Sequence, residues 1–139
     1  VRVEGHGTCF CFKPLGPGDS NFINSALESF SIANGVASPA LRVQLDAKAL
    51  VENGEAEIET FRAVQPMLVH FHANEPGLEV LGTSGQVDHD RLGAMLREIG
   101  YEGFISIEQR MGNEKDPLAD IEISTAMLKR YYDGEAASA

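Results

Sequence analysis

Positive charge is scarce in this sequence. Its 11 lysines and arginines face 21 aspartates and glutamates, which gives a formal net charge of −10 at pH 7. An electrostatic field of this sign repels nucleic acids and anionic lipid surfaces. The composition therefore argues against a nucleic-acid-binding protein and against a protein that works on a membrane surface.

Long apolar runs are missing as well. No stretch approaches the roughly 20 apolar residues that are needed to cross a bilayer. The first residues also lack the basic and then apolar pattern of a secretion signal. We therefore predict no membrane partner and a cytoplasmic location.

Cysteine is limited to Cys9 and Cys11. A disulfide between two cysteines so close in the chain would be strained, and there is no third cysteine to pair with either. We predict two free thiols in a reducing compartment. A zinc site that combines them with His70 and His72 is a less favoured alternative, because structural zinc sites space their cysteines more widely.

The 139 residues, of which 43% are hydrophobic, are enough for the core of one domain. Predicted strands alternate four times with predicted helices. The strands cover residues 1–4, 41–45, 67–72 and 104–107, and the helices begin near 19–20, 52, 88 and 116. Such alternation gives a parallel sheet covered by helices. We predict an α/β chain whose residues 1–132 form half of a (β/α) barrel or a small open sheet, with a flexible tail over 133–139.

A metal-ligand type of residue stands at the end of every predicted strand. These residues are Glu4, Asp46, His72 and Glu108. The carboxyl ends of parallel strands meet at one edge of the sheet, where α/β proteins place their chemistry. Carboxylates with one imidazole suit Mn²⁺, Mg²⁺, Co²⁺ or Zn²⁺. The pattern therefore predicts a site for one divalent metal ion at this edge.

Other polar residues near the strand ends are candidate substrate contacts. They are His6, Lys48, His70, Glu75 and Arg110. His70 shares a strand face with His72 but should lie one layer deeper, as a supporting residue. Asp88 is expected to cap its helix, with His89 and Asp90 exposed on the first turn.

Short motifs along the chain point to a family. They are Val3-Glu4-Gly5, Leu45-Asp46-Ala47, His70-Phe71-His72, Asn74-Glu75-Pro76 and Val87-Asp88-His89. The most specific is the run from Ile99 to Glu108, in which Gly-Tyr-Glu-Gly precedes a strand that ends in glutamate. Together they resemble the sugar isomerase and epimerase group of xylose-isomerase-like TIM barrels. The resemblance covers nearly the whole chain, but only the carboxyl-terminal half of such barrels.

The resemblance implies a metal-dependent isomerase or epimerase that acts on a sugar or related polyol. Glu4, Asp46, His72 and Glu108 would hold the metal ion, and Glu4 and Glu108 would also move a proton at the carbon beside a carbonyl. A metal ion that polarises the carbonyl acidifies that C–H bond, and carboxylates can then remove and return the proton.

Some positions depart from the ketose 3-epimerases of this group. Those enzymes have a glutamate six residues after the first ligand, a histidine three after the aspartate and an arginine six after the histidine. Counted from Glu4, Asp46 and His72, this chain has Phe10, Ala49 and Leu78 there. The substrate therefore stays open.

Three alternatives to an isomerase remain from the sequence. A dehydratase or lyase of a cyclitol or sugar acid could use the same metal site. A DNA-repair endonuclease on the same barrel needs more histidines than the four present, and a basic groove, so we disfavour it. The third is a non-catalytic barrel fragment.

A half-barrel would leave two unpaired strand edges and an uncovered apolar face. The chain also begins at Val1, inside a predicted strand. We therefore expect it to be a portion of a larger barrel. The missing amino-terminal half is the favoured partner, and a second copy of the chain is the alternative.

Overall fold

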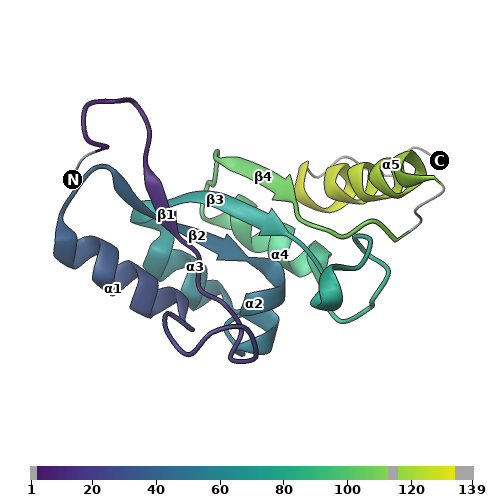
Figure 1. Cartoon of the computed structure of the whole chain (residues 1–139), viewed down its shortest axis with the longest axis horizontal. Coiled ribbons are helices and arrows are strands. Elements are labelled where there is room, and N and C mark those ends of the chain that lie inside the picture. Colours follow the sequence, from purple (N-terminus) through teal and green to yellow (C-terminus); the bar gives the residue numbers. More distant parts are fainter. Residues whose placement is uncertain (1–2, 113–115, 134–139) are drawn as a thin grey trace.

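The computed structural model of the chain describes residues 3–112 and 116–133 (Figure 1). Its centre is a sheet of four parallel strands in the order β1-β2-β3-β4. The strands are β1 (Phe10–Phe12), β2 (Leu41–Asp46), β3 (Leu68–Ala73) and β4 (Phe104–Ile107). Each strand thus pairs with the next one in sequence, as right-handed strand–helix–strand units predict. The expected α/β class with a parallel sheet is confirmed.

Helices connect and flank the strands. They are α1 (Ala26–Val36), α2 (Ala47–Glu52), α3 (Ile58–Val64), α4 (His89–Glu98) and α5 (Pro117–Leu128), with 3₁₀ turns at Gln65–Met67 and Pro76–Leu78 and a π-helix at Lys129–Asp133. Asp88 and Asp116 cap α4 and α5 as predicted, since each carboxylate accepts a hydrogen bond from the backbone N–H three residues later.

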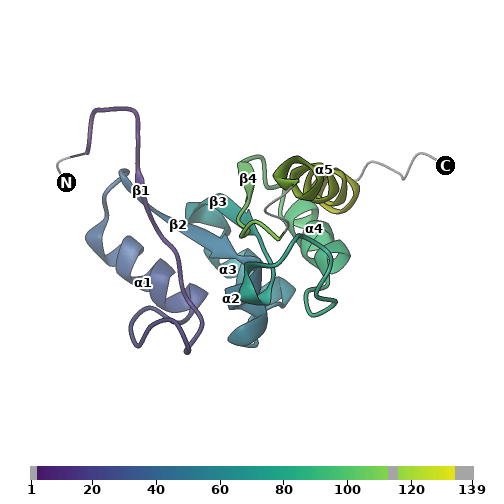
Figure 2. The same cartoon turned by 45° about the vertical axis from the view of Figure 1, so that its right-hand side comes forward.

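The two faces of the sheet differ in character. Val43, Leu45 and Phe71 point to one face and are fully buried, because the helices cover it (Figures 1 and 2). They form one core with helix side chains that include Ala33, Leu50, Phe61, Val64, Leu92 and Leu96. Gln44 and His70, which alternate with them, point to the other face. No helix in the described part of the chain covers that face (Figure 2).

The first strand differs from the prediction. Residues 3–7 form turns, and β1 follows them at Phe10–Phe12, paired with Leu41–Val43. Gly5 and Gly7 have φ values of 82° and 68°, in the left-handed region that a strand does not use. The alternating Phe-Cys-Phe segment has the aromatic content that favours strands. Glycines and prolines on either side of this segment favour a loop, which is why the sequence pattern does not predict the strand.

Three helices also differ from the prediction. α3 begins at Ile58, later than the predicted start near residue 52, which is the end of α2. α1 begins at Ala26 with Ser25 as its cap, later than the predicted start at Asp19 or Ser20. α2 was not predicted, because Asp46 both ends β2 and caps α2, which leaves no loop between them. Asp133 ends the π-helix, and the rest of the predicted tail, 134–139, lies outside the described residues. No helix in the described part of the chain has the length and apolar character to cross a bilayer.

Candidate functional site at the carboxyl edge of the sheet

Three of the predicted metal ligands come together in the structure. Nδ1 of His72 lies 3.1 Å from Oε2 of Glu108 and 3.8 Å from Oδ2 of Asp46. One ligand atom from each of the three lies within 4.8 Å of the others. Parallel pairing explains this arrangement, because Asp46 is in register with His72 and β4 runs beside β3. The described residues thus contain a group that could hold a metal ion, and no cysteine belongs to it.

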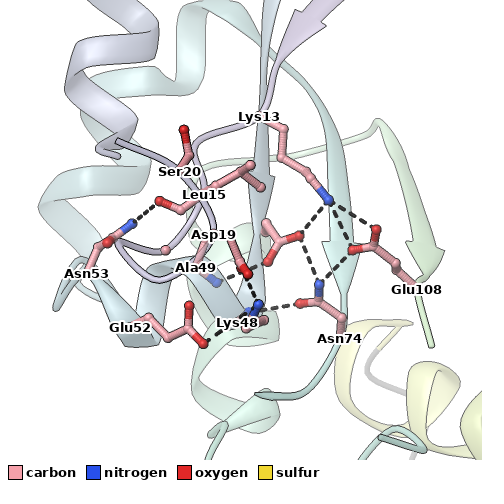
Figure 3. A network of polar contacts seen from close by, with 12 residues as sticks. Lys13, Leu15, Asp19, Ser20, Lys48, Ala49, Glu52, Asn53, Asn74 and Glu108 are labelled. Atoms are coloured by element: carbon pink, nitrogen blue, oxygen red, sulfur yellow. Dashed lines mark hydrogen bonds and ion pairs between the residues drawn. The ribbon is translucent and has the colours of Figure 1, made fainter. Parts of the chain in front are cut away.

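The side chain of Lys13 enters this group. Its Nζ lies 3.1 Å from both carboxylate oxygens of Glu108 (Figure 3) and 3.2 Å from Oδ2 of Asp46. Nδ1 of His72 lies 3.5 Å from the same Nζ. Lys13 directly follows β1, so it stands at the strand end where the prediction placed Glu4. The prediction missed it because β1 was missed. Once Phe10–Phe12 is read as a strand, Lys13 is the next polar residue.

Asn74 ties the two carboxylates together. Its Nδ2 donates to Oδ2 of Asp46 at 2.9 Å and to Oε2 of Glu108 at 2.8 Å, and its Oδ1 accepts from the backbone N–H of Lys48 at 2.8 Å (Figure 3). Asn74 is 1% exposed. The sequence held a signal for it, since it lies two residues beyond His72 and continues the same face. We call Lys13, Asp46, His72, Asn74 and Glu108 the Lys13 cluster.

The electrostatics of the Lys13 cluster keep Glu108 ionised. Partial burial by itself would raise the pKa of Glu108, but the hydrogen bonds and charge of Lys13, with a smaller contribution from His72, lower it to about 2. Oδ1 of Asp46 also accepts a hydrogen bond from the backbone N–H of Ala49 at 3.0 Å. Every carboxylate oxygen of the cluster therefore has a donor from within the chain.

Glu4 and His6 lie far from this cluster, contrary to the prediction. Ser38 donates a hydrogen bond to Glu4, and Ser38 precedes β2, so Glu4 lies at the amino edge of the sheet. Asp46 is at the other end of β2, which at about 3.3 Å per residue is roughly 16 Å away. His6 is exposed on the same turn as Glu4. The predicted roles of Glu4 as metal ligand and catalytic residue, and of His6 as substrate contact, are therefore wrong. The comparison of Phe10 with the second glutamate of the ketose 3-epimerases was counted from Glu4, so it no longer applies.

The remaining predicted contacts divide into two groups. Lys48 and Arg110 line a hollow of about 360 Å³ above the cluster, together with Lys13, Asn74 and Glu108. Lys48 forms ion pairs with Asp19 and Glu52 on the wall of this hollow. Arg110 is exposed. Their role as substrate contacts stays a prediction.

His70 lies two residues before His72 on β3, further from the carboxyl edge of the sheet. Its Nε2 is 3.0 Å from Oγ of Ser106, and its ring stacks edge-on against His72 with the centroids 5.2 Å apart. Burial, with a smaller effect from the neighbouring His72, lowers the pKa of His70. This arrangement suits a neutral residue that supports His72.

Glu75 and His89 are sealed inside the chain, contrary to the prediction. Glu75 is 0% exposed, and its Oε1 lies 2.8 Å from Nε2 of His89 and accepts from the backbone N–H of Gly82 at 2.7 Å. Ser84 donates to its other oxygen, and Nδ1 of His89 lies 2.6 Å from the hydroxyl of Tyr132. We call these five residues the Glu75 network. With its oxygens bonded inside the core, Glu75 cannot serve as a substrate contact.

The fold and the strand-end cluster agree with a family match over almost the entire chain. Residues 2–131 match the family described as the xylose isomerase-like TIM barrel. The chain belongs to this family. Since the family's barrel has eight strands, the four strands here correspond to half of one.

Solved structures with the same fold support this relationship. D-psicose 3-epimerase from Clostridium cellulolyticum H10, solved with D-tagatose, matches 88% of this chain and 49% of its own, with a TM-score of 0.78 and 21% identity. An L-ribulose 3-epimerase matches 92% and 48%, with a TM-score of 0.80 and 19% identity. A 3-keto-D-glucoside 4-epimerase from E. coli matches 92% and 48%, with a TM-score of 0.81 and 21% identity. The chain spans about half the length of each.

Proposed function

We propose that this chain contributes the carboxyl-edge site of a sugar isomerase or epimerase. In this reaction a proton moves at the carbon beside the carbonyl of a ketose or related polyol. The observation that supports the proposal most strongly is the Lys13 cluster, which combines two carboxylates, an imidazole and an ammonium. The two carboxylates and the ammonium line an open hollow. The similar structures named as psicose, ribulose and ketoglucoside epimerases agree with this reaction class.

Glu108 is the group that we assign to proton transfer. Its side chain is 34% exposed and lines the hollow, whereas the side chain of Asp46 is only 3% exposed and also caps α2. A carboxylate that is ionised at neutral pH can accept a proton from carbon, and the protonated Glu108 can then return it to the neighbouring carbon, as in an isomerisation. The positive charge of Lys13 would stabilise the negative charge that then develops on the substrate oxygen.

A resident divalent metal ion, which the sequence predicts, stays a prediction. Asp46, His72 and Glu108 offer three ligand atoms of suitable type, but Glu4 does not supply the fourth, and the Lys13 ammonium lies among the three. While the Lys13 ammonium lies in this place, these residues do not fit a resident divalent ion. The reaction above therefore uses no metal-bound step. The partner that completes the barrel, whether an amino-terminal half or a second copy, likewise stays a prediction.

Deuterium uptake from solvent tests the reaction class. The full protein is incubated in D₂O with a panel of ketoses, and exchange at the carbon beside the carbonyl is followed by NMR. We expect exchange into at least one ketose, and a loss of about 100-fold or more with Glu108→Gln. The matched control is Glu98→Gln, which changes an exposed glutamate on α4.

Absence of exchange into every ketose would contradict the proposal. Formation of a dehydrated product from a cyclitol or sugar acid would replace it with the dehydratase reading. If neither reaction occurs, the non-catalytic reading holds.

A further inference from the structure

We propose that Lys13 supplies the positive charge of this site in place of a divalent metal ion. The strand ends of the sheet carry Lys13, Asp46, His72 and Glu108 in that order. Asp46, His72 and Glu108 can act as hydrogen-bond acceptors or metal ligands, whereas the Lys13 ammonium can only donate hydrogen bonds. Asp46, His72 and Glu108 thus surround a positive charge, and that charge is the ammonium group of Lys13 rather than a bound ion.

The contacts of Lys13 are those expected of a bound cation. A lysine ammonium has three N–H donors and no lone pair, so it cannot act as a metal ligand while charged. Its Nζ has three carboxylate oxygens within 3.2 Å and Nδ1 of His72 at 3.5 Å. These include one atom from each member of the candidate metal group. An ion bound to the same atoms would lie beside the ammonium, and the two positive charges would repel each other.

The charges lead to the same conclusion. Asp46 and Glu108 carry two negative charges, and Lys13 compensates one of them at close range. Asn74 donates to both carboxylates and holds them in place around the ammonium. Since a divalent ion binds through oxygens and nitrogens at 2.0–2.6 Å, it would need Lys13 to leave. Replacing Lys13 with a carboxylate would instead give the ion a fourth ligand.

Lys48 provides a matched control within the same hollow. It lines the hollow with Lys13 and is also held by two carboxylates, those of Asp19 and Glu52. None of these residues belongs to the candidate metal group. Removing the charge of Lys48 therefore changes the local electrostatic field but leaves the Lys13 ammonium in place among Asp46, His72 and Glu108.

Manganese binding tests the proposal. The full protein and the variants Lys13→Glu, Lys13→Gln and Lys48→Gln are stripped with a chelator and dialysed. They are then titrated with Mn²⁺ without any sugar, and free Mn²⁺ is measured by electron paramagnetic resonance. We expect Lys13→Glu to bind one Mn²⁺ per chain at least ten times more tightly than the unchanged protein. Lys13→Gln should bind with intermediate affinity, and Lys48→Gln should bind like the unchanged protein.

Two results would overturn the proposal. One is stoichiometric Mn²⁺ binding by the unchanged protein as tight as that of Lys13→Glu, because Lys13 would then move aside for the ion. The other is no gain of binding in either Lys13 variant when circular dichroism shows them folded. Lys13→Gln preserves much of the side-chain volume, so it serves if Lys13→Glu fails to fold. Because no sugar is used, the result is independent of the proposed isomerase activity.

Discussion

The Lys13 cluster and the Glu75 network contain the same kind of pair, a carboxylate beside a histidine, but they meet water differently. In the Lys13 cluster the side chains of Glu108 and His72 are 34% and 22% exposed. In the Glu75 network the side chains of Glu75 and His89 are 0% and 3% exposed. Glu108 of the first pair lines a hollow that can admit a substrate. The second is closed on all sides and fixes the segment after β3 against α4 and the π-helix.

This difference shows why residue type alone does not identify a site. Both carboxylates follow a parallel strand, and both have several donors. Glu75 has its donors from its own loop and from His89, so it completes a buried structure. Glu108 has Lys13 and Asn74 as donors but keeps one side toward the hollow. We expect loss of stability when the Glu75 network is cut, and loss of function when the Lys13 cluster is cut.

The largest expected effect on stability is that of His89→Ala. The substitution leaves the buried carboxyl group of Glu75 without its histidine partner, and we expect the free energy of unfolding to fall by about 3 kcal/mol. Urea denaturation followed by circular dichroism measures this. The matched control is Arg62→Ala, which breaks an exposed ion pair with Glu98 and should cost less than about 1 kcal/mol. Equal losses for the two variants would contradict the view that the Glu75 network stabilises the fold.

A smaller, local effect is expected in the Lys13 cluster itself. Burial raises the pKa of Glu108 and Lys13 lowers it, so Lys13→Gln should raise that pKa from about 2 toward its ordinary value of 4.5. Because the folded-state pKa lies below the unfolded one, Glu108 contributes stability above about pH 4.5 that is lost as the pH falls toward 2. That acid-dependent loss should shrink in the variant. Carboxyl ¹³C NMR titration of Glu108 measures the shift, and an unchanged pKa would contradict the role of Lys13.

The sequence was sufficient to predict much of this arrangement. Hydrophobic alternation and capping residues located β2, β3, β4, α4 and α5, and strand-end logic located Asp46, His72 and Glu108. It failed at β1, because a three-residue strand between glycines and prolines carries too little periodicity to stand out. Because of that error, Glu4 was predicted at the first strand end, where the structure has Lys13. The predicted site therefore had a carboxylate where the structure has a positive charge. Burial of Glu75 and His89 could not be predicted, because Tyr132, which contacts His89, lies 43 residues further along the chain than His89.

The smallest effect concerns how far water reaches along the open face of the sheet. Cys11 lies two residues before Lys13 on β1 and is half-buried, whereas Cys9 is exposed. Burial, together with a smaller effect of Cys9, raises the pKa of Cys11 to about 11. Since the thiolate is the reactive form, only about one Cys11 in a thousand is reactive at pH 8.

We expect iodoacetamide to modify Cys9 first and Cys11 much more slowly, with the rate at Cys11 rising tenfold per pH unit up to about pH 11. Peptide mass spectrometry over time measures both rates, with Cys9→Ser to isolate Cys11. Equal rates at the two cysteines would show that water reaches Cys11, next to Lys13, as easily as it reaches the exposed Cys9. Lys13 would then be no better shielded from water than a lysine on the protein surface.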